Sequence, residues 1–404
     1  MKFLVLTNYD NKIIKSKNKV YLGDWCKKRF YPKEKVFENI WDNTNLIKKD
    51  YFLLKKIIYK KNKKYSKFLF KYHNKIIPIK VWEKMIFIWL VIFVHSSYFR
   101  WKTVKKNLSN KKLKFINITN LRFKYSVDTK DYLLNNQNSH EFNYLSYKNL
   151  ILFLNKKNIK IINKKFNKLD SDKHKNLNFV LFNLKNFFFD FNIFLENFFL
   201  KPKIFFLESI NYKFYLIINI IFYQLPFKLY NTFNWNFIKN KINDDQRKFI
   251  DKISLSKNHQ PTFENYLDEI FIDNLPSCYL SGFKTLYFYA EKIKIKPRLI
   301  FSAFGHIYNE VFKLWSFLRL YKNKSKVFSI QHGGHHQLIY TSYDYEFKNF
   351  NKHISWIKKY NKYSKSLPII KYFFKQDINY LSNEKILFVG NDKHDFFSRI
   401  TPGP

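Results

Sequence analysis

The chain is poor in the residues that punctuate or crosslink small folds. Its 404 residues include only two cysteines, seven glycines and ten prolines, and alanine occurs only as Ala290 and Ala303. Cys26 and Cys278 lie far apart and lack CxxC spacing, which argues against a disulfide framework and against a zinc site. This cysteine usage fits a reducing cytoplasm.

Long apolar runs are also absent. The start of the chain, MKFLVLTNYDNK, has an apolar core of about five residues, shorter than the roughly 7–15 of a signal peptide, and it predicts a buried strand. The most apolar stretch, residues 85–94 (MIFIWLVIFV), is shorter than the ~18 residues that a spanning helix needs. It favours a core helix over a membrane helix.

The charge is strongly one-sided, with a formal net value of +44. Lys, Asn, Ile, Phe and Tyr are all frequent, and these are the residues that A/T-rich codons specify, so codon bias explains much of the basicity. Arginine, which binds phosphates and bases in bidentate fashion, is rare. The composition therefore argues against nucleic acid as a partner and favours anionic small molecules and an acidic membrane face.

The pattern of apolar runs predicts an α/β fold with a parallel sheet, because short strands alternate with helical segments. The predicted strands are residues 3–7, 20–23, 299–303, 327–331 and 386–390. Apolar residues at helical spacing predict helices over residues 47–65, 81–101, 245–253, 263–272, 276–291 and 308–321.

Two segments give no clear periodicity. Residues 102–176 are rich in Asn, Lys and Ser, and we expect a loosely built insertion or peripheral subdomain there. Residues 177–227 are strongly aromatic, which is consistent either with core packing or with docking to a membrane. Residues 351–363 and 367–381 are expected to bridge to the last strand.

One loop concentrates chemistry. The run KVFSIQHGGHH, residues 326–336, delivers Gln331, His332, Gly333 and Gly334 to the end of a predicted strand. Adjacent glycines in a chain with so few predict positive φ angles or close approach of the backbone to a ligand.

Two motifs carry a family resemblance. YLGDWC (residues 21–26) and SIQHGG (residues 329–334) resemble the LGEWC and QHGG motifs of a family of transferases of surface-polysaccharide (lipopolysaccharide and O-antigen) biosynthesis. Further similar segments follow in the family's order, at residues 82–100, 276–287, 296–315 and 342–356. The chain departs from the family at Asp24, where the motif has Glu, and after Gly334, where His335, His336 and Gln337 replace Gly and Tyr.

The resemblance implies a GT-B-like architecture, in which two Rossmann-type lobes enclose a cleft. Residues 386–404 look like the start of the family's C-terminal half. We therefore expect an acceptor-side α/β domain over residues 1–380, with a helical and aromatic insertion around residues 102–240. Residues 381–404 would begin a truncated donor domain, so that the second lobe is incomplete.

Glycosyl transfer needs a base for the acceptor hydroxyl and stabilisation of the departing diphosphate. His332 is the first choice for the catalytic group, although it could also simply fix the loop. Backbone amides of Gly333 and Gly334 could bind an anion, and Gln331 and His335 are predicted to contact substrate.

Four more residues enter the predicted site. Asp24 is expected to orient acceptor hydroxyls or else to cap a helix, and Trp25 to stack on a sugar. His306 and Glu310, spaced i and i+4, are expected on one helical face, as a base with its carboxylate or as a surface pair. Metal binding by the histidine cluster is not favoured, because no carboxylate has the usual spacing.

The resemblance thus implies a metal-independent glycosyltransferase-like enzyme without a cofactor, which we expect to be cytoplasmic and, in one interpretation, peripheral to the inner membrane. Its partners would be a nucleotide-activated sugar and a glycan or lipid-linked acceptor. Two alternatives stay open: a CDP-glycerol-type glycerophosphotransferase, and a non-catalytic scaffold of a glycan-assembly complex.

Overall fold

The structure of the protein is a computed structural model. It describes residues 1–26, 36–108, 112–154, 158–165, 204–207, 247, 261–303, 305–331, 349–355, 364–366 and 396.

The first sheet is parallel and has the order β2-β1-β3-β4. Its strands are β1 (Lys2–Val5), β2 (Lys19–Tyr21), β3 (Leu113–Ile118) and β4 (Ile159–Lys164). The chain first moves outward from β1 to β2 and later returns to place β3 on the other side of β1. The strand order therefore reverses between β1 and β3, and in open α/β sheets ligands bind outside the carboxyl ends of the strands at such a point.

The second sheet is also parallel, and its order follows the chain. Its strands are β5 (Ile204–Leu207), β6 (Leu299–Ser302), β7 (Lys326–Ile330), β8 (Lys352–Ser355) and β9 (Ser364–Ser366). Between β6 and β7 the chain forms α11 (Gly305–Tyr308) and α12 (Glu310–Lys322), as a βαβ unit requires.

The remaining helices surround and join the sheets. They are α1 (Asn8–Asn11), α2 (Thr44–Tyr72), α3 (Ile79–Met85), α4 (Phe87–Leu108), α5 (Thr129–Asp131), α6 (His140–Phe153), α9 (Phe263–Asn274) and α10 (Phe283–Lys292). Short 3-10 turns occur at Asp24–Cys26 and Ser277–Tyr279, and a π-helical turn occurs at Tyr132–Asn136.

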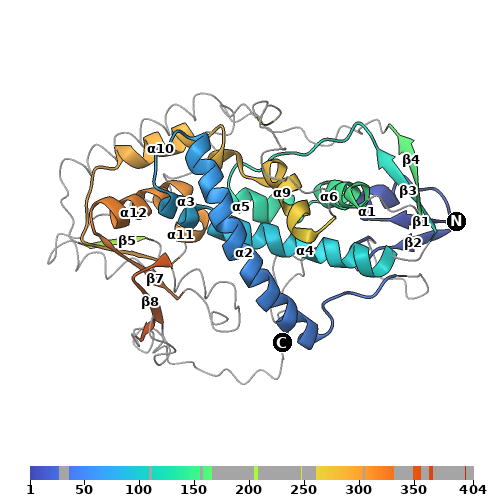
Figure 1. Ribbon diagram of the computed structural model, residues 1–404, viewed down its shortest axis with the longest axis horizontal. Coiled ribbons are helices and arrows are strands. Elements are labelled where there is room, and N and C mark those ends of the chain that lie inside the picture. Colours follow the sequence, from blue (N-terminus) through green and yellow to red (C-terminus); the bar gives the residue numbers. More distant parts are fainter. Residues whose placement is uncertain are drawn as a thin grey trace, which may run out of the picture.

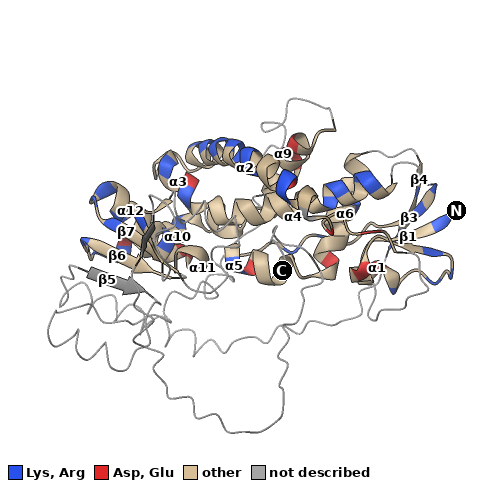
Figure 2. Cartoon of the chain, turned by 90° about the horizontal axis from the view of Figure 1, so that it is seen from below, with Lys and Arg blue, Asp and Glu red and all other residues tan. Residues whose placement is uncertain are grey.

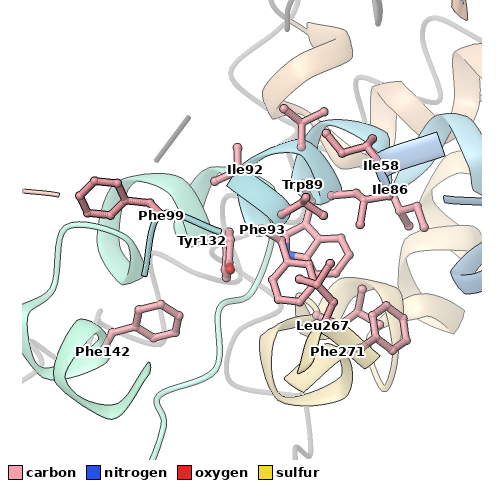
Figure 3. Packing of buried hydrophobic residues seen from close by; sticks show 14 of the residues in the cluster. Ile58, Ile86, Trp89, Ile92, Phe93, Phe99, Tyr132, Phe142, Leu267 and Phe271 are labelled. Carbon is pink, nitrogen blue, oxygen red and sulfur yellow. The ribbon is translucent and has the colours of Figure 1, made fainter. Parts of the chain in front are cut away.

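Helix α4 is the centre of the hydrophobic core. The rings of Trp89 and Phe93 stack at 5.0 Å, and Trp89 also meets the ring edges of Tyr132 and Phe271 (Figure 3). The indole nitrogen of Trp89 donates to the carbonyl of Asn274 at 3.1 Å, so the buried polar atom is satisfied. The core helix predicted from residues 85–94 is confirmed from Phe87 onward, but the helix predicted over residues 81–101 is divided, because α3 ends at Met85 and α4 begins at Phe87. Among the described helices, none combines the length and the apolar character needed to cross a bilayer.

The two sheets point their carboxyl ends toward each other. Strands β1 and β7 start at opposite ends of the molecule and run toward its middle, where α5 and α11 lie (Figure 1). A backbone amide of α5, from Thr129, lies 3.4 Å from the carboxylate of Glu310 on α12. The two carboxyl edges are thus held on either side of a shared central layer.

The α/β class with parallel sheets is confirmed, and so are the strands predicted at residues 3–7, 20–23, 299–303 and 327–331. Residues 102–176 were expected to form a loosely built insertion or peripheral subdomain, and this prediction is wrong. Strand β3 of this segment lies in the middle of the first sheet and pairs with β4 over its whole length. Its sequence, LKFINI, is short and interrupted by Lys and Asn, which hid the strand.

The helix predicted over residues 276–291 is broken. Leu280 has φ −118° and ψ −106°, which no helix accommodates, and α10 begins only after Gly282. Strand β8 interrupts the first part of the predicted bridge, because it pairs with β7 in the second sheet, and β9 follows between the two bridging segments and pairs with β8.

Several predictions fall outside the described residues. These are the strand at residues 386–390, nearly all of the helix at residues 245–253, and the aromatic segment except for β5. The division of the chain at residue 380 stays a prediction. Phe396 packs against the first α/β unit, with its ring 6.0 Å from that of Trp25 and 5.1 Å from that of His140.

Candidate functional site

The turn after β1 is organised around the carboxylate of Asp10. Its oxygens accept hydrogen bonds from the backbone amides of Leu6 (2.8 Å) and Thr7 (2.7 Å) and from the Thr7 hydroxyl (3.2 Å). Asp10 is 1% exposed, and the loss of water raises its pKa to about 6 even though the backbone hydrogen bonds lower it. A buried carboxyl group with a raised pKa therefore lies where the strand order of the first sheet reverses.

Tyr144 of α6 fixes the neighbouring strand at the same edge. Its hydroxyl donates to the carbonyl of Ile116 at 2.7 Å and accepts from the amide of Ile118 at 3.0 Å. The ammonium group of Lys148 donates to the carbonyl of Ile118 at 3.0 Å. The end of β3 is consequently as firmly held as the end of β1.

The LGDWC segment has a clear packing role. The indole nitrogen of Trp25 donates to the carbonyl of Leu6 at 3.0 Å, and the ring stacks on Tyr147 at 6.2 Å with an interplanar angle of 5°. A Cβ atom on Gly23 would come within 2.3 Å of this ring, so glycine is required there. Trp25 is 7% exposed, and the expectation that it stacks on a sugar is corrected: its ring already packs on protein.

Asp24 lies between the buried residues Gly23 and Trp25, and its own side chain is exposed. It is the first residue of the 3-10 turn that follows the carboxyl end of β2. The segment thus presents one carboxylate to solvent next to a rigid aromatic anchor.

Gln331 comes directly after β7, at the carboxyl edge of the second sheet. Gln331 is 3% exposed, its amide donates to the carbonyl of Ile354 at 2.8 Å, and its side-chain oxygen accepts from the hydroxyl of Ser355 at 2.8 Å. These bonds anchor the start of the loop to β8. His332, Gly333, Gly334 and His335 lie outside the described residues.

His306 and Glu310 do not share one helix. His306 belongs to α11 and Glu310 starts α12, and between them Asn309 caps α12 with extended backbone angles (φ −108°, ψ 101°). Both side chains are fully buried, so the surface-pair interpretation is wrong. The ring of His306 meets the ring of Phe350 edge-on at 4.8 Å.

Glu310 is part of a buried ionic cluster. Its carboxylate accepts hydrogen bonds from the Lys313 ammonium group at 3.0 Å and from the Tyr279 hydroxyl at 2.7 Å. The Tyr279 hydroxyl also lies 3.0 Å from the hydroxyl of Thr129 and from the carbonyl of Met85. Four separate elements meet at this cluster, which joins the second sheet unit to the central helices.

Asp128 borders the same cluster. Burial raises its pKa to about 6, and the negative charges of Glu310 and Asp131 act in the same direction. Its carboxylate caps α5 by accepting from the amide of Asp131 at 2.7 Å. The layer between the two edges therefore contains a second carboxyl group with a raised pKa.

A sequence model of the LIC12162 family transferases matches residues 2–401. The chain belongs to this family. No curated protein and no solved structure matches it. The match supports the transferase part of the resemblance. The buried cluster around Glu310 and the carboxyl edges of the two sheets are therefore features of a LIC12162 family transferase.

Sequence reasoning missed three buried residues of this LIC12162 family transferase: Asp10, Lys313 and Tyr279. Asp10 had a signal, because Thr7 and Asp10 have the spacing of a capping box directly after a strand. Lys313 is one of many lysines, and its burial depends on tertiary contacts that no local pattern reveals. Among the described residues, no group of three or more His, Cys, Asp and Glu side chains is arranged to hold a metal ion.

Proposed function

We propose that this LIC12162 family transferase moves a sugar from a nucleotide-activated donor to a glycan or lipid-linked acceptor of surface-polysaccharide biosynthesis. The observation that carries the proposal is the pair of parallel sheets whose carboxyl edges face the middle of the molecule (Figure 1). Ligands of open α/β sheets bind at that edge, so two such edges suit a reaction between two substrates.

In this proposal the first edge receives the acceptor. The strand order reverses between β1 and β3, and the exposed carboxylate of Asp24 and the buried carboxyl group of Asp10 lie at the ends of β2 and β1. Asp24 accepts a hydrogen bond from an acceptor hydroxyl, while Asp10 and Trp25 hold the turns on which this contact depends.

The second edge receives the donor. Gln331, whose side chain accepts a hydrogen bond from Ser355 of β8, follows the carboxyl end of β7, and His332, Gly333 and Gly334 come next in the sequence. The acceptor oxygen forms a bond to the anomeric carbon as the bond from that carbon to the diphosphate breaks. His332 takes the hydroxyl proton, and the backbone amides of the glycine pair bind the diphosphate, which leaves as the nucleoside diphosphate.

The test is nucleotide release by the purified protein. UDP-, GDP- and dTDP-linked sugars and CDP-glycerol are each incubated with the chain and an extract of polysaccharide intermediates, and the released nucleotide is measured. We expect release of a nucleoside diphosphate with one donor, and its loss in His332→Ala but not in His336→Ala. Failure of every nucleotide sugar, or equal release by both variants, contradicts the proposal.

The same assay separates the two alternatives. Release of CMP from CDP-glycerol would identify a glycerophosphotransferase instead. Absence of binding and release with every donor would favour the scaffold hypothesis.

A further inference from the structure

The outer face of α2 combines positive charge with exposed apolar side chains. The helix has 29 residues and is therefore about 43 Å long, at 1.5 Å per residue. Its inner face is buried through residues such as Leu54, Tyr65 and Leu69. The opposite face points away from the sheets and carries most of its lysines (Figure 2). We propose that this face docks the protein onto an anionic lipid bilayer.

The positive charge of this face is not neutralised within the described part of the chain. Six lysines of α2 are exposed and form no salt bridge with any described carboxylate: Lys48, Lys49, Lys56, Lys63, Lys67 and Lys71. The helix has a single acidic residue, Asp50, which is 4% exposed and accepts from the side chains of Trp41 and Lys102 on the inner side. An anionic surface is the complementary partner, because each such lysine gains from a negative surface potential.

The same face also carries large apolar side chains. Leu46, Phe52 and Leu53 are 40%, 51% and 45% exposed and lie within the first three turns of the helix. Positions 46, 49, 53, 56, 60, 63, 67 and 71 follow intervals of three or four, so Leu46 and Leu53 fall in the same stripe as the lysines. No described element covers these three side chains.

This combination favours lipid over other anions. Aliphatic side chains such as those of Leu46 and Leu53 gain nothing from a solvated phosphate backbone. At a bilayer they enter the boundary between headgroups and acyl chains while the neighbouring ammonium groups bind lipid phosphates. The first turns of α2 therefore insert deepest, and the later lysines lie along the surface.

The docking surface is independent of the proposed reaction. Transfer to a soluble acceptor needs no bilayer, and vesicle binding needs no donor, so the two proposals fail in different experiments.

The test compares two patches of equal charge. Vesicles of phosphatidylcholine with about 30% phosphatidylglycerol are sedimented with the full chain, and pure phosphatidylcholine vesicles serve as the reference. One triple variant reverses Lys49, Lys56 and Lys63 to Glu. The matched control reverses the exposed lysines Lys284, Lys296 and Lys324, so that both variants lose the same net charge.

We expect the α2 triple variant to lower the vesicle partition coefficient by about tenfold or more and the control by less than about threefold. Phe52→Ser with Leu53→Ser is expected to remove the binding that persists in about 0.5 M salt, whereas Phe288→Ser is not. Phe288 is a suitable control because it is 55% exposed and has the ammonium group of Lys292 at 4.8 Å from its ring centroid.

A labelled residue gives a second readout. The two native cysteines are buried, so a single introduced cysteine can be labelled selectively with an environment-sensitive dye. Phe52→Cys is expected to show a blue shift with anionic vesicles, and Phe288→Cys none. Three results would each overturn the proposal: equal losses of vesicle binding in the two triple variants, no effect of the Phe52 and Leu53 substitutions on vesicle binding, or no blue shift of a dye at position 52. The outer face of α2 would then be a solvated, positively charged face.

Discussion

Removing the ammonium group of Lys313 is expected to destabilise the protein by about 3 kcal/mol. Lys313 and Glu310 are both 0% exposed and their charged atoms lie 3.0 Å apart. Lys313→Met preserves the length of the side chain and leaves a buried carboxylate without its counter-ion. Losing one partner of a buried pair costs about 3–5 kcal/mol. We expect the lower end, because the Tyr279 hydroxyl and the Thr129 amide still donate to the carboxylate.

The double variant decides whether the reasoning is right. Glu310→Gln alone leaves the ammonium group buried and should cost a similar amount, whereas Glu310→Gln with Lys313→Met leaves no charge in the cluster. We expect the double variant to lose only about 1–2 kcal/mol, which is a coupling of roughly 4 kcal/mol. The free energies come from urea unfolding followed by tryptophan fluorescence. Single losses below about 1 kcal/mol, or a double loss equal to the sum of the singles, would refute a buried ion pair.

Three further predictions concern stability. Gly23→Ala should lower the urea midpoint clearly, because its Cβ would lie 2.3 Å from the Trp25 ring, and Trp25→Leu in the same chain should restore part of the loss. Asp10 has a folded pKa of about 6, above the unfolded value, so the stability of the native protein relative to Asp10→Asn should rise by up to about 3 kcal/mol as the pH falls from about 6 to 4. His73 has its pKa lowered to about 4 by burial, so its contribution has the opposite sign: relative to His73→Gln, stability should fall between about pH 6.5 and 4. Urea titrations across this pH range measure both slopes, and parallel curves for variant and native protein would contradict them.

The sequence predicted strands well where an apolar run was uninterrupted. LIFS at β6 and KVFSI at β7 lie within the predicted strands except at Lys326, while β3 and β8 were missed because Lys, His and Asn interrupt their apolar positions. Strand pairing was also beyond the sequence, since the separation into two sheets depends on long-range contacts. Amphipathic spacing located α2 and α4 but not their full lengths.

The candidate site was predicted less completely than the fold. The motif residues Asp24 and Gln331 do lie at carboxyl ends of parallel strands, as their positions after apolar runs indicated. Trp25 was misjudged, because an aromatic residue next to a carboxylate has the same local sequence whether it binds a sugar or fills a core. For Glu310, the helix boundary at Asn309 and the burial of Lys313 decide the environment, and both are consequences of tertiary packing.

The most direct test of the central claim, that the substrates bind at the facing carboxyl edges, is hydrogen exchange measured with and without saturating nucleotide-sugar donor. The account predicts that the donor slows exchange in peptides that contain Gln331, Gly305 and the end of β8, and leaves the opposite ends of the same strands, around Arg298 and Lys324, unchanged. Protection confined to those opposite ends would contradict it.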